Sequence, residues 1–216
     1  MALQLGALLH DADDKKYFPQ NTAYENCREV MRKSLRAAAE AGVDVKGIKR
    51  ETIEMISYVS ASANGNTVPE RAMQHPELLW VRWADRLEAI GTIGAVRCWQ
   101  YNVEKGRDPL SLVTTPRCTT KEEVWALVTP DRLENYMKSG TSASMMDHYW
   151  DKLLHIAKFD KKVVRNAWMC AEAERRVDPL VKVCIEFGKT GEPPISMIKK
   201  FAKQIDKEKK KREAEK

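Results

Sequence analysis

Apolar residues recur at three- and four-residue steps along almost the whole chain, and this spacing is what most restricts its fold. The predicted helix over residues 22–41, for example, carries on one side Tyr24, Cys27, Met31, Leu35 and Ala38. No stretch alternates apolar and polar residues over the length of a strand, and we find no internal repeat at a period of about 20 to 50 residues. We therefore predict an all-α fold.

The same periodicity, with the usual start and stop residues, divides most of the chain into helices. We predict them over residues 48–60, 76–105, 121–127, 131–138, 142–159 and 161–187. Pro76 suits the first position of a helix, and Gly42 and Gly106 suit the left-handed position that follows one. Pro179 should kink or split the last of these helices.

Length and composition favour one ordinary globular domain. The chain has 216 residues, 43% of them hydrophobic, which is enough for a core without disulfide or zinc staples. No apolar run approaches the roughly 20 residues needed to cross a bilayer, so we expect no membrane span. The five cysteines are scattered and odd in number, which predicts reduced thiols and a cytoplasmic protein.

The positive charge is concentrated at the end of the chain. Residues 199–216 hold nine Lys or Arg and four Asp or Glu, a net +5 of the chain's +6. We therefore divide the chain into a domain over residues 1–190 and a Lys-rich extension over 191–216. The extension is either a solvated helical tail or a contact for an anionic partner, and a nucleic acid could bind only there.

The first candidate site follows an apolar stretch at the start of the chain. Its sequence is Leu8-Leu9-His10-Asp11-Ala12-Asp13-Asp14-Lys15-Lys16. Three carboxylates at the C-terminal end of a helix are unfavourable, because the helix dipole is negative there and the acids repel one another. Either the two lysines or a divalent cation should compensate, and imidazole with carboxylate oxygens is a suitable ligand set for such an ion.

A second acidic residue lies within the long apolar helix predicted over 76–105. Asp85 shares a face with Val81 and Ala89, so we expect it to be buried and to need a cation. That cation is either Arg82, three residues earlier, or a metal ion shared with the His-Asp pair. The glycines at 91 and 94, about one turn apart, predict the close approach of another helix.

These residues resemble the motifs of the HD-domain metal-dependent phosphohydrolases, particularly small bacterial and viral members that include nucleotide pyrophosphohydrolases. The resemblance rests on Leu8-Leu9-His10-Asp11 with Asp14, Lys16 and Tyr17, on the segment from Ala84 to Arg97, on His148-Tyr149-Trp150-Asp151-Lys152-Leu153-Leu154, and on the helix from Ala171 to Phe187. It covers about residues 1 to 190. It implies a single HD-domain helical bundle.

The resemblance also implies roles for individual residues. His10, Asp11 and Asp85 would bind a divalent metal ion, which could be Mn²⁺, Mg²⁺, Fe²⁺ or Co²⁺. Asp14 would position or deprotonate the attacking water, and Lys16 would hold a phosphate. Three further residues are candidates for contacts with the substrate: Arg86, Lys152 and His148. For each of these three, a structural or surface interaction is an equal alternative.

The chain departs from the family at one metal ligand. The first ligand histidine of the family precedes the His-Asp pair by a helix and a loop, whereas this chain begins nine residues before His10. A longer natural protein, a substitute histidine or an incomplete metal site would each account for this. Two hypotheses follow: a metal-dependent phosphohydrolase acting on a nucleotide-like small molecule, or an inactive HD-fold module that binds a nucleotide or a protein.

Overall fold

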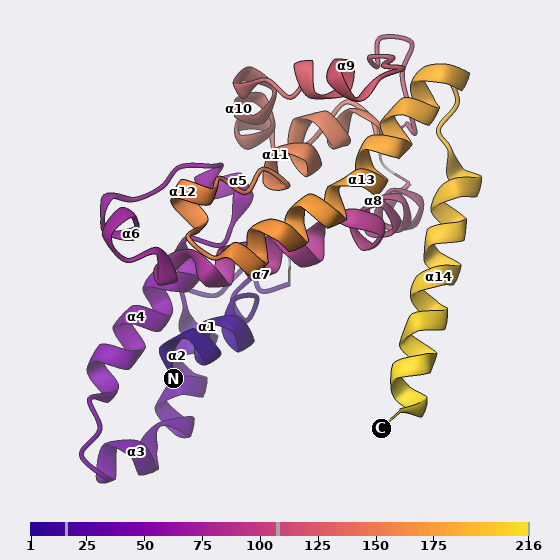
Figure 1. Cartoon of the computed structure of the whole chain (residues 1–216). Coiled ribbons are helices and arrows are strands. Elements are labelled where there is room, and N and C mark those ends of the chain that lie inside the picture. Colours follow the sequence, from indigo (N-terminus) through magenta and orange to yellow (C-terminus); the bar gives the residue numbers. More distant parts are fainter. Residues whose placement is uncertain (16, 107–108, 216) are drawn as a thin grey trace. The chain divides into compact units, whose positions relative to one another are not determined.

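The chain folds into helices joined by turns and short loops, as a computed structural model shows (Figure 1). The structure describes residues 1–15, 17–106 and 109–215. Within these ranges every regular element is a helix and no strand occurs, so the all-α prediction is confirmed. The helices form two compact units. One comprises residues 1–60, 67–85 and 162–165, and the other comprises 61–66, 86–161 and 166–216.

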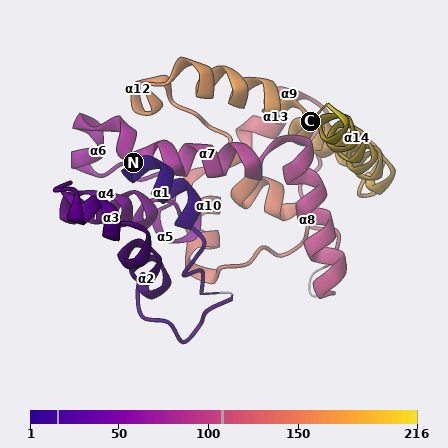
Figure 2. The same cartoon turned by 90° about the horizontal axis from the view of Figure 1, so that it is seen from below.

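The first unit contains the N-terminal helices. In chain order they are α1 (Ala2–Leu9), α2 (Glu25–Ser34), α3 (Arg36–Glu40), α4 (Val45–Ser57), α6 (Glu70–Gln74), the 3-10 helix η1 (Pro76–Leu79), the first part of α7 (Trp80–Ala89) and most of α12 (Lys161–Val164). Helix α1 lies along α4, as both views show (Figures 1 and 2). A small buried core joins α1, α2 and α4 through Leu9, Cys27, Met31, Leu35 and Ile56.

The second unit has the larger core. Its helices are α5 (Ala61–Asn64), the rest of α7, α8 (Gly91–Lys105), α9 (Lys121–Ala126), α10 (Pro130–Ser139), the π-helix η2 (Tyr149–Leu153), α11 (Leu154–Ile156), α13 (Ala167–Thr190) and α14 (Ile195–Ala214). Helix α8 packs against both α13 and α14. Tyr149, Trp150, Leu180 and Phe187 are among the fully buried side chains of this core.

Several predicted helices are interrupted where the sequence shows a continuous pattern. The predicted helix over 76–105 breaks between α7 and α8, because Ile90 is extended and Gly91 has a φ of +76°. The helix predicted over 161–187 is broken at Arg165, whose φ is +48°. The predicted split at Pro179 is wrong, because Pro179 lies inside an unbroken α13. The helix expected over 142–159 begins only at Asp147, directly before η2.

Other start and stop residues act as predicted. Gly42 and Gly106 have positive φ values of 80° and 56°, and Pro76 opens η1. The helix predicted over 22–41 is divided in two at Leu35, which separates α2 from α3. Helix α9 begins with a complete capping box of Thr120 and Glu123, which was not predicted.

The Lys-rich extension is helical over Ile195–Ala214, and its first half packs on the core of the second unit. Ile198 is fully buried, and Phe201, Ala202 and Ile205 pack partly buried against the same core. The Nζ atom of Lys199 lies 5.7 Å from the centroid of the Trp99 ring on α8. In the described ranges, no helix combines the length and apolar character that a membrane crossing requires.

Candidate functional site

His10 is the residue directly after α1, and its ring is held in one orientation. Its Nδ1 atom lies 2.9 Å from the carbonyl oxygen of Ala7, one turn earlier. Because a carbonyl oxygen only accepts hydrogen bonds, Nδ1 carries a proton and donates it to this contact. The other ring nitrogen, Nε2, is therefore the atom that His10 presents to its neighbours. Metal-binding histidines are commonly oriented by such a contact.

The two carboxylates predicted to accompany His10 lie next to this Nε2 atom. Asp11 Oδ2 is 3.3 Å from it, and Asp85 Oδ1, which α7 contributes, is 3.7 Å from it. The structure thus brings together residues that are 74 and 75 positions apart in the sequence. The imidazole is mostly covered, with 23% of its side chain exposed, whereas Asp11 is largely exposed.

A glycine allows this approach. Gly6 lies one turn before His10 on α1, and Val81 lies one turn before Asp85 on α7. A Cβ atom on Gly6 would be 3.0 Å from Cγ2 of Val81, so a larger side chain would push the two helices apart. Gly6 therefore approaches Val81 closely, one turn before the His10–Asp85 pair.

The electrostatic environment of His10 favours a cation. The pKa of His10 is raised from 6.5 to about 9, chiefly through the Asp85 carboxylate facing its Nε2 atom. The Ala7 carbonyl and Asp11 also raise this pKa, while burial lowers it. The site therefore stabilises positive charge between two carboxylates.

The prediction that Asp85 is buried is wrong. Its side chain is 37% exposed. The Arg82 guanidinium, expected as its alternative partner, is fully buried and donates to the carbonyl oxygens of Tyr58 and Thr67. Burial lowers the pKa of Arg82 to about 10. Arg82 therefore binds the main chain around α5, and His10 is the group that faces Asp85.

The loop after His10 is fixed by an interaction that the sequence analysis missed. The Asp13 carboxylate accepts hydrogen bonds from the backbone N–H groups of Asn26 at 2.8 Å and Cys27 at 2.9 Å. These N–H groups belong to the first turn of α2, so Asp13 caps that helix from 13 residues away. The pKa of Asp13 is lowered, because hydrogen bonds from Cys27, Asn26 and Asn21 outweigh the opposing effect of its burial.

Of the two predicted catalytic residues, Asp14 lies in this same loop. Asp14 is half-buried, and its carbonyl oxygen accepts from the backbone N–H groups of Tyr17 and Phe18 in a tight turn. Lys16, predicted to hold a phosphate, lies outside the described residues. Asp14 therefore follows the His-Asp pair at the start of a turn.

His10, Asp11 and Asp85 carry nitrogen and oxygen atoms that suit a divalent ion, and the distances between these atoms are close to those between two ligands of one ion. Two ligands about 2.1 Å from one ion, at angles of about 90° to 109°, lie about 3.0 to 3.4 Å apart. The His10–Asp11 separation of 3.3 Å falls in this range, and the His10–Asp85 separation of 3.7 Å exceeds it by a few tenths of an ångström. As the side chains stand, no three His, Cys, Asp or Glu residues of the described ranges are grouped closely enough to hold a metal ion.

The three predicted substrate contacts all belong to the second unit. Arg86 is 1% exposed and donates to Asn66 Oδ1 and to the carbonyl oxygen of Gly65, so its guanidinium supports the turn after α5. His148 lies 3.2 Å from Ser142 Oγ, through Nδ1, and packs edge-on against Tyr136. Lys152 Nζ lies 5.4 Å from the centroid of the Tyr136 ring. We assign Arg86 a structural role, and it is not part of the site proposed below.

Comparison with known proteins identifies one relative. No family model matches the chain, and no solved structure matches it. The uncharacterized protein L803 of Acanthamoeba polyphaga mimivirus is 34% identical over 194 residues, an alignment that covers 87% of this chain and 76% of the viral protein. This chain therefore belongs to the same family as the mimivirus protein L803.

Proposed function

We propose that the protein is a metal-dependent phosphohydrolase of the HD class that acts on a nucleotide-like small molecule. One observation carries the proposal: His10 Nε2 lies within 3.7 Å of carboxylate oxygens of both Asp11 and Asp85. These three side chains were selected from the sequence through a resemblance that requires them to meet. Their proximity supports the resemblance.

In this function His10, Asp11 and Asp85 would hold a divalent ion after a small inward rotation of Asp85. Such an ion supplies a water of lowered pKa and neutralises charge on a phosphoryl group. The Ala7 carbonyl keeps Nδ1 of His10 protonated and so leaves Nε2 available as a ligand atom. Asp14, three residues after Asp11, is the candidate for orienting the attacking water. A cytoplasmic location is part of the proposal and is supported by five free cysteines.

Metal binding tests the proposal first. The full chain is dialysed against Mn²⁺, Mg²⁺, Fe²⁺ or Co²⁺, and bound metal is measured by elemental analysis and calorimetry. We expect stoichiometric binding that weakens at least about 100-fold in His10→Gln and in Asp85→Asn. The matched control is Glu40→Gln, which removes an exposed carboxylate of the same unit, 67% exposed and paired with Arg36. If the unchanged chain binds none of these ions, the proposal is wrong.

Turnover is then measured on nucleoside mono-, di- and triphosphates, with metal or EDTA, recording phosphate and pyrophosphate release separately. We expect release that requires the metal and disappears in Asp85→Asn but not in Glu40→Gln. The released product distinguishes a nucleotidase from a pyrophosphohydrolase.

The alternative, an inactive HD-fold module, is favoured by the charge state of His10. With a pKa of about 9, a protonated His10 satisfies both carboxylates as an ion-paired cluster without any metal. This alternative predicts a metal-free protein in which Asp85→Asn lowers the free energy of unfolding at pH 7. Stoichiometric metal with metal-dependent release of phosphate would exclude it.

We also propose that contact with a nucleic acid, if the protein makes one, involves α14 alone. Exposed lysines recur along one side of this helix at Lys200, Lys203, Lys207 and Lys210, opposite its packed apolar side. Their spacing of three and four residues suits a row of phosphates. Removing residues 207–216 tests this proposal.

A further inference from the structure

The second unit contains a polar cavity that the sequence analysis did not predict. Its volume is about 300 Å³, and its lining comes from α10, the loop after it and the start of η2. The groups that matter for binding are Arg132, Asn135, Tyr136, Ser142, Asp147 and Asp151. A cavity of this size accommodates a molecule of one or two small rings.

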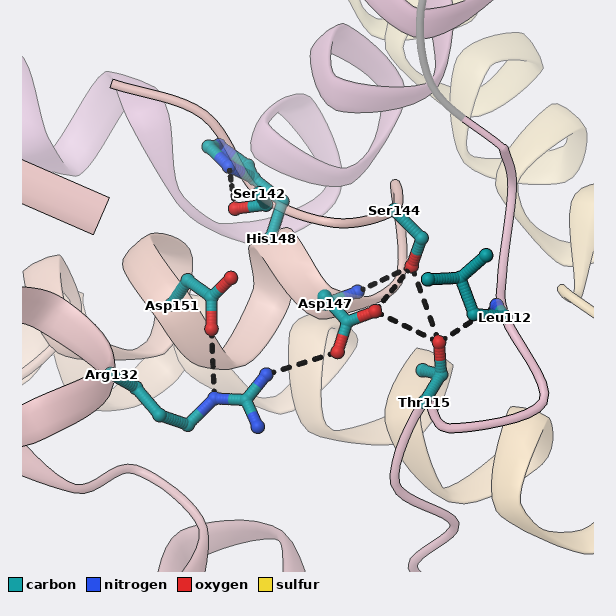
Figure 3. Close-up of polar contacts among 8 residues, drawn as sticks. All are labelled: Leu112, Thr115, Arg132, Ser142, Ser144, Asp147, His148 and Asp151. Atoms are coloured by element: carbon teal, nitrogen blue, oxygen red, sulfur yellow. Dashed lines mark hydrogen bonds and ion pairs between the residues drawn. The ribbon is translucent and has the colours of Figure 1, made fainter. Parts of the chain in front are cut away.

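Arg132 is held rigidly at this cavity by two carboxylates, as Figure 3 shows. Its Nε atom donates to Asp151 Oδ1 at 2.8 Å, and its Nη2 atom donates to Asp147 Oδ1 at 3.1 Å. Its side chain is 24% exposed. Within the described residues, Nη1 has no hydrogen-bond partner, so this fixed guanidinium retains two unused N–H donors.

Asp147 is in turn anchored from behind. Its Oδ2 atom accepts hydrogen bonds from Thr115 Oγ1 at 2.8 Å and from Ser144 Oγ at 2.7 Å (Figure 3). The residue is 7% exposed, and Thr115 and Ser144 are buried as well. The following backbone forms the π-helix η2, an arrangement that occurs often at functional sites. The polar groups of the cavity are therefore pre-organised.

The chemistry of the lining favours a neutral ligand with several hydroxyl groups. Two carboxylates face one guanidinium, so these groups carry a net negative charge and disfavour an anion. Asn135 and Ser142 add side chains that both donate and accept hydrogen bonds. Tyr136 provides an apolar wall, and its ring is fixed by His148 on one side and by Lys152.

We propose that this cavity binds a neutral sugar ring through adjacent hydroxyl groups, either as a free sugar or as the ribose of a nucleoside. Adjacent hydroxyls match this lining because each donates to a carboxylate while its oxygen accepts from Arg132 Nη1 or the Asn135 amide. An acidic side chain that accepts from ribose hydroxyls is a known means of recognising nucleosides. The site lies within the second unit and does not depend on the proposed metal site.

The test is a binding experiment on the full chain in EDTA, followed by amide chemical shifts in two-dimensional NMR. The probes are adenosine, 2′-deoxyadenosine, methyl glucoside and inorganic phosphate, each at millimolar concentration. We expect adenosine, the glucoside or both to shift the amides of Asn135 and Ser142, with dissociation constants in the millimolar range or below. Weaker binding of 2′-deoxyadenosine than of adenosine would identify ribose as the ring, and binding of the glucoside would identify a free sugar.

A pair of variants separates binding in the cavity from effects elsewhere. The Asn135 side chain is exposed and makes no hydrogen bond within the described residues, so Asn135→Ala should leave the fold intact. It should weaken sugar binding about three- to tenfold. The control is Glu134→Ala, because this neighbour on α10 is 63% exposed and does not line the cavity.

Several results would overturn the proposal. The first is that none of the sugars shifts the amides of Asn135 or Ser142. The second is that adenosine and 2′-deoxyadenosine give equal shifts while the glucoside does not bind. The third is that phosphate binds and the sugars do not. Unchanged affinity in Asn135→Ala would also overturn it.

Discussion

His155 is a buried imidazole that the fold holds in its neutral form. It is 3% exposed, and its Nε2 atom has no hydrogen-bond partner in the described part of the chain. Its pKa is lowered from 6.5 to about 4, first because burial disfavours the charged ring and then because Lys158 and Arg132 repel it. The neutral side chain fits the core of the second unit, whereas a proton on it would be costly.

This environment predicts a loss of stability in mild acid. Below pH 6.5 the unfolded chain protonates His155 while the folded chain does not until about pH 4. The contribution of His155 is therefore complete above pH 6.5 and is lost as the pH falls towards 4, by about 2 kcal/mol at pH 5. Urea unfolding at pH 7.5 and 5 measures this difference, and His155→Gln should reduce it. His75→Gln, which removes a 54% exposed histidine, is the control, and an equal reduction in it would contradict the assignment.

Sequence reasoning about single residues grouped distant positions only where a motif joined them, and the metal-binding role of that group stays a prediction. It selected His10, Asp11 and Asp85, which the structure places together. It did not select Asp13, because a cap that acts on a helix 13 residues away leaves no local pattern. Nor did it find the pairing of Arg132 with Asp147, since two arginine–aspartate contacts between separate helices have no characteristic spacing.

At the scale of helices, Gly6 of α1 lies tightly against Val81 of α7, one turn before His10 and Asp85. Gly6→Leu should separate the two helices, since even a Cβ atom there would be 3.0 Å from Val81. We expect the free energy of unfolding to fall by about 1–3 kcal/mol and the affinity for a divalent ion to fall with it. Chemical denaturation and calorimetry measure the two effects. Ala7→Leu, at the exposed next position of α1, should change neither, and unaltered stability in Gly6→Leu would refute the packing argument.

The apolar periodicity predicted where helices lie, but it did not predict the breaks within a periodic segment. Gly91 was predicted to admit another helix, and a Cβ atom there would lie 3.2 Å from the carbonyl oxygen of Arg176 on α13. Its positive φ also ends the long helix, which an apolar pattern continuing on both sides conceals. Pro179 is tolerated in α13 because Val177, Leu180 and Val181 around it are buried in the core. Tertiary packing therefore outweighed local preference at both places.

At the scale of the whole chain, the described residues divide into two compact units. Composition could not reveal this division, because α7 runs through the boundary and its apolar pattern does not change there. The division into a domain over 1–190 and an extension over 191–216 stays a prediction. The packing of Ile198, Phe201 and Ile205 nonetheless extends the core of the second unit beyond residue 190.

Two truncations separate the packed and the solvated halves of α14. Ending the chain after Asp206 removes residues that are exposed wherever they are described, so the free energy of unfolding should change by less than about 0.5 kcal/mol. Ending it after Pro194 also removes the fully buried Ile198. We therefore expect the free energy of unfolding to fall by about 2–5 kcal/mol or more. Urea unfolding of the three chains measures both effects, and equal stabilities would show that α14 does not support the core.

The shorter truncation also tests the proposed contact with nucleic acids. Because Lys207, Lys210 and Lys211 are lost, the chain ending at Asp206 should bind single-stranded DNA more weakly at low salt and with a smaller dependence on salt concentration. Fluorescence anisotropy at several salt concentrations gives both quantities for the full and shortened chains. Since stability should be the same in these two chains, any difference in binding reports the lysines themselves. Identical binding and salt dependence would exclude residues 207–216 of α14 as a site for nucleic acids.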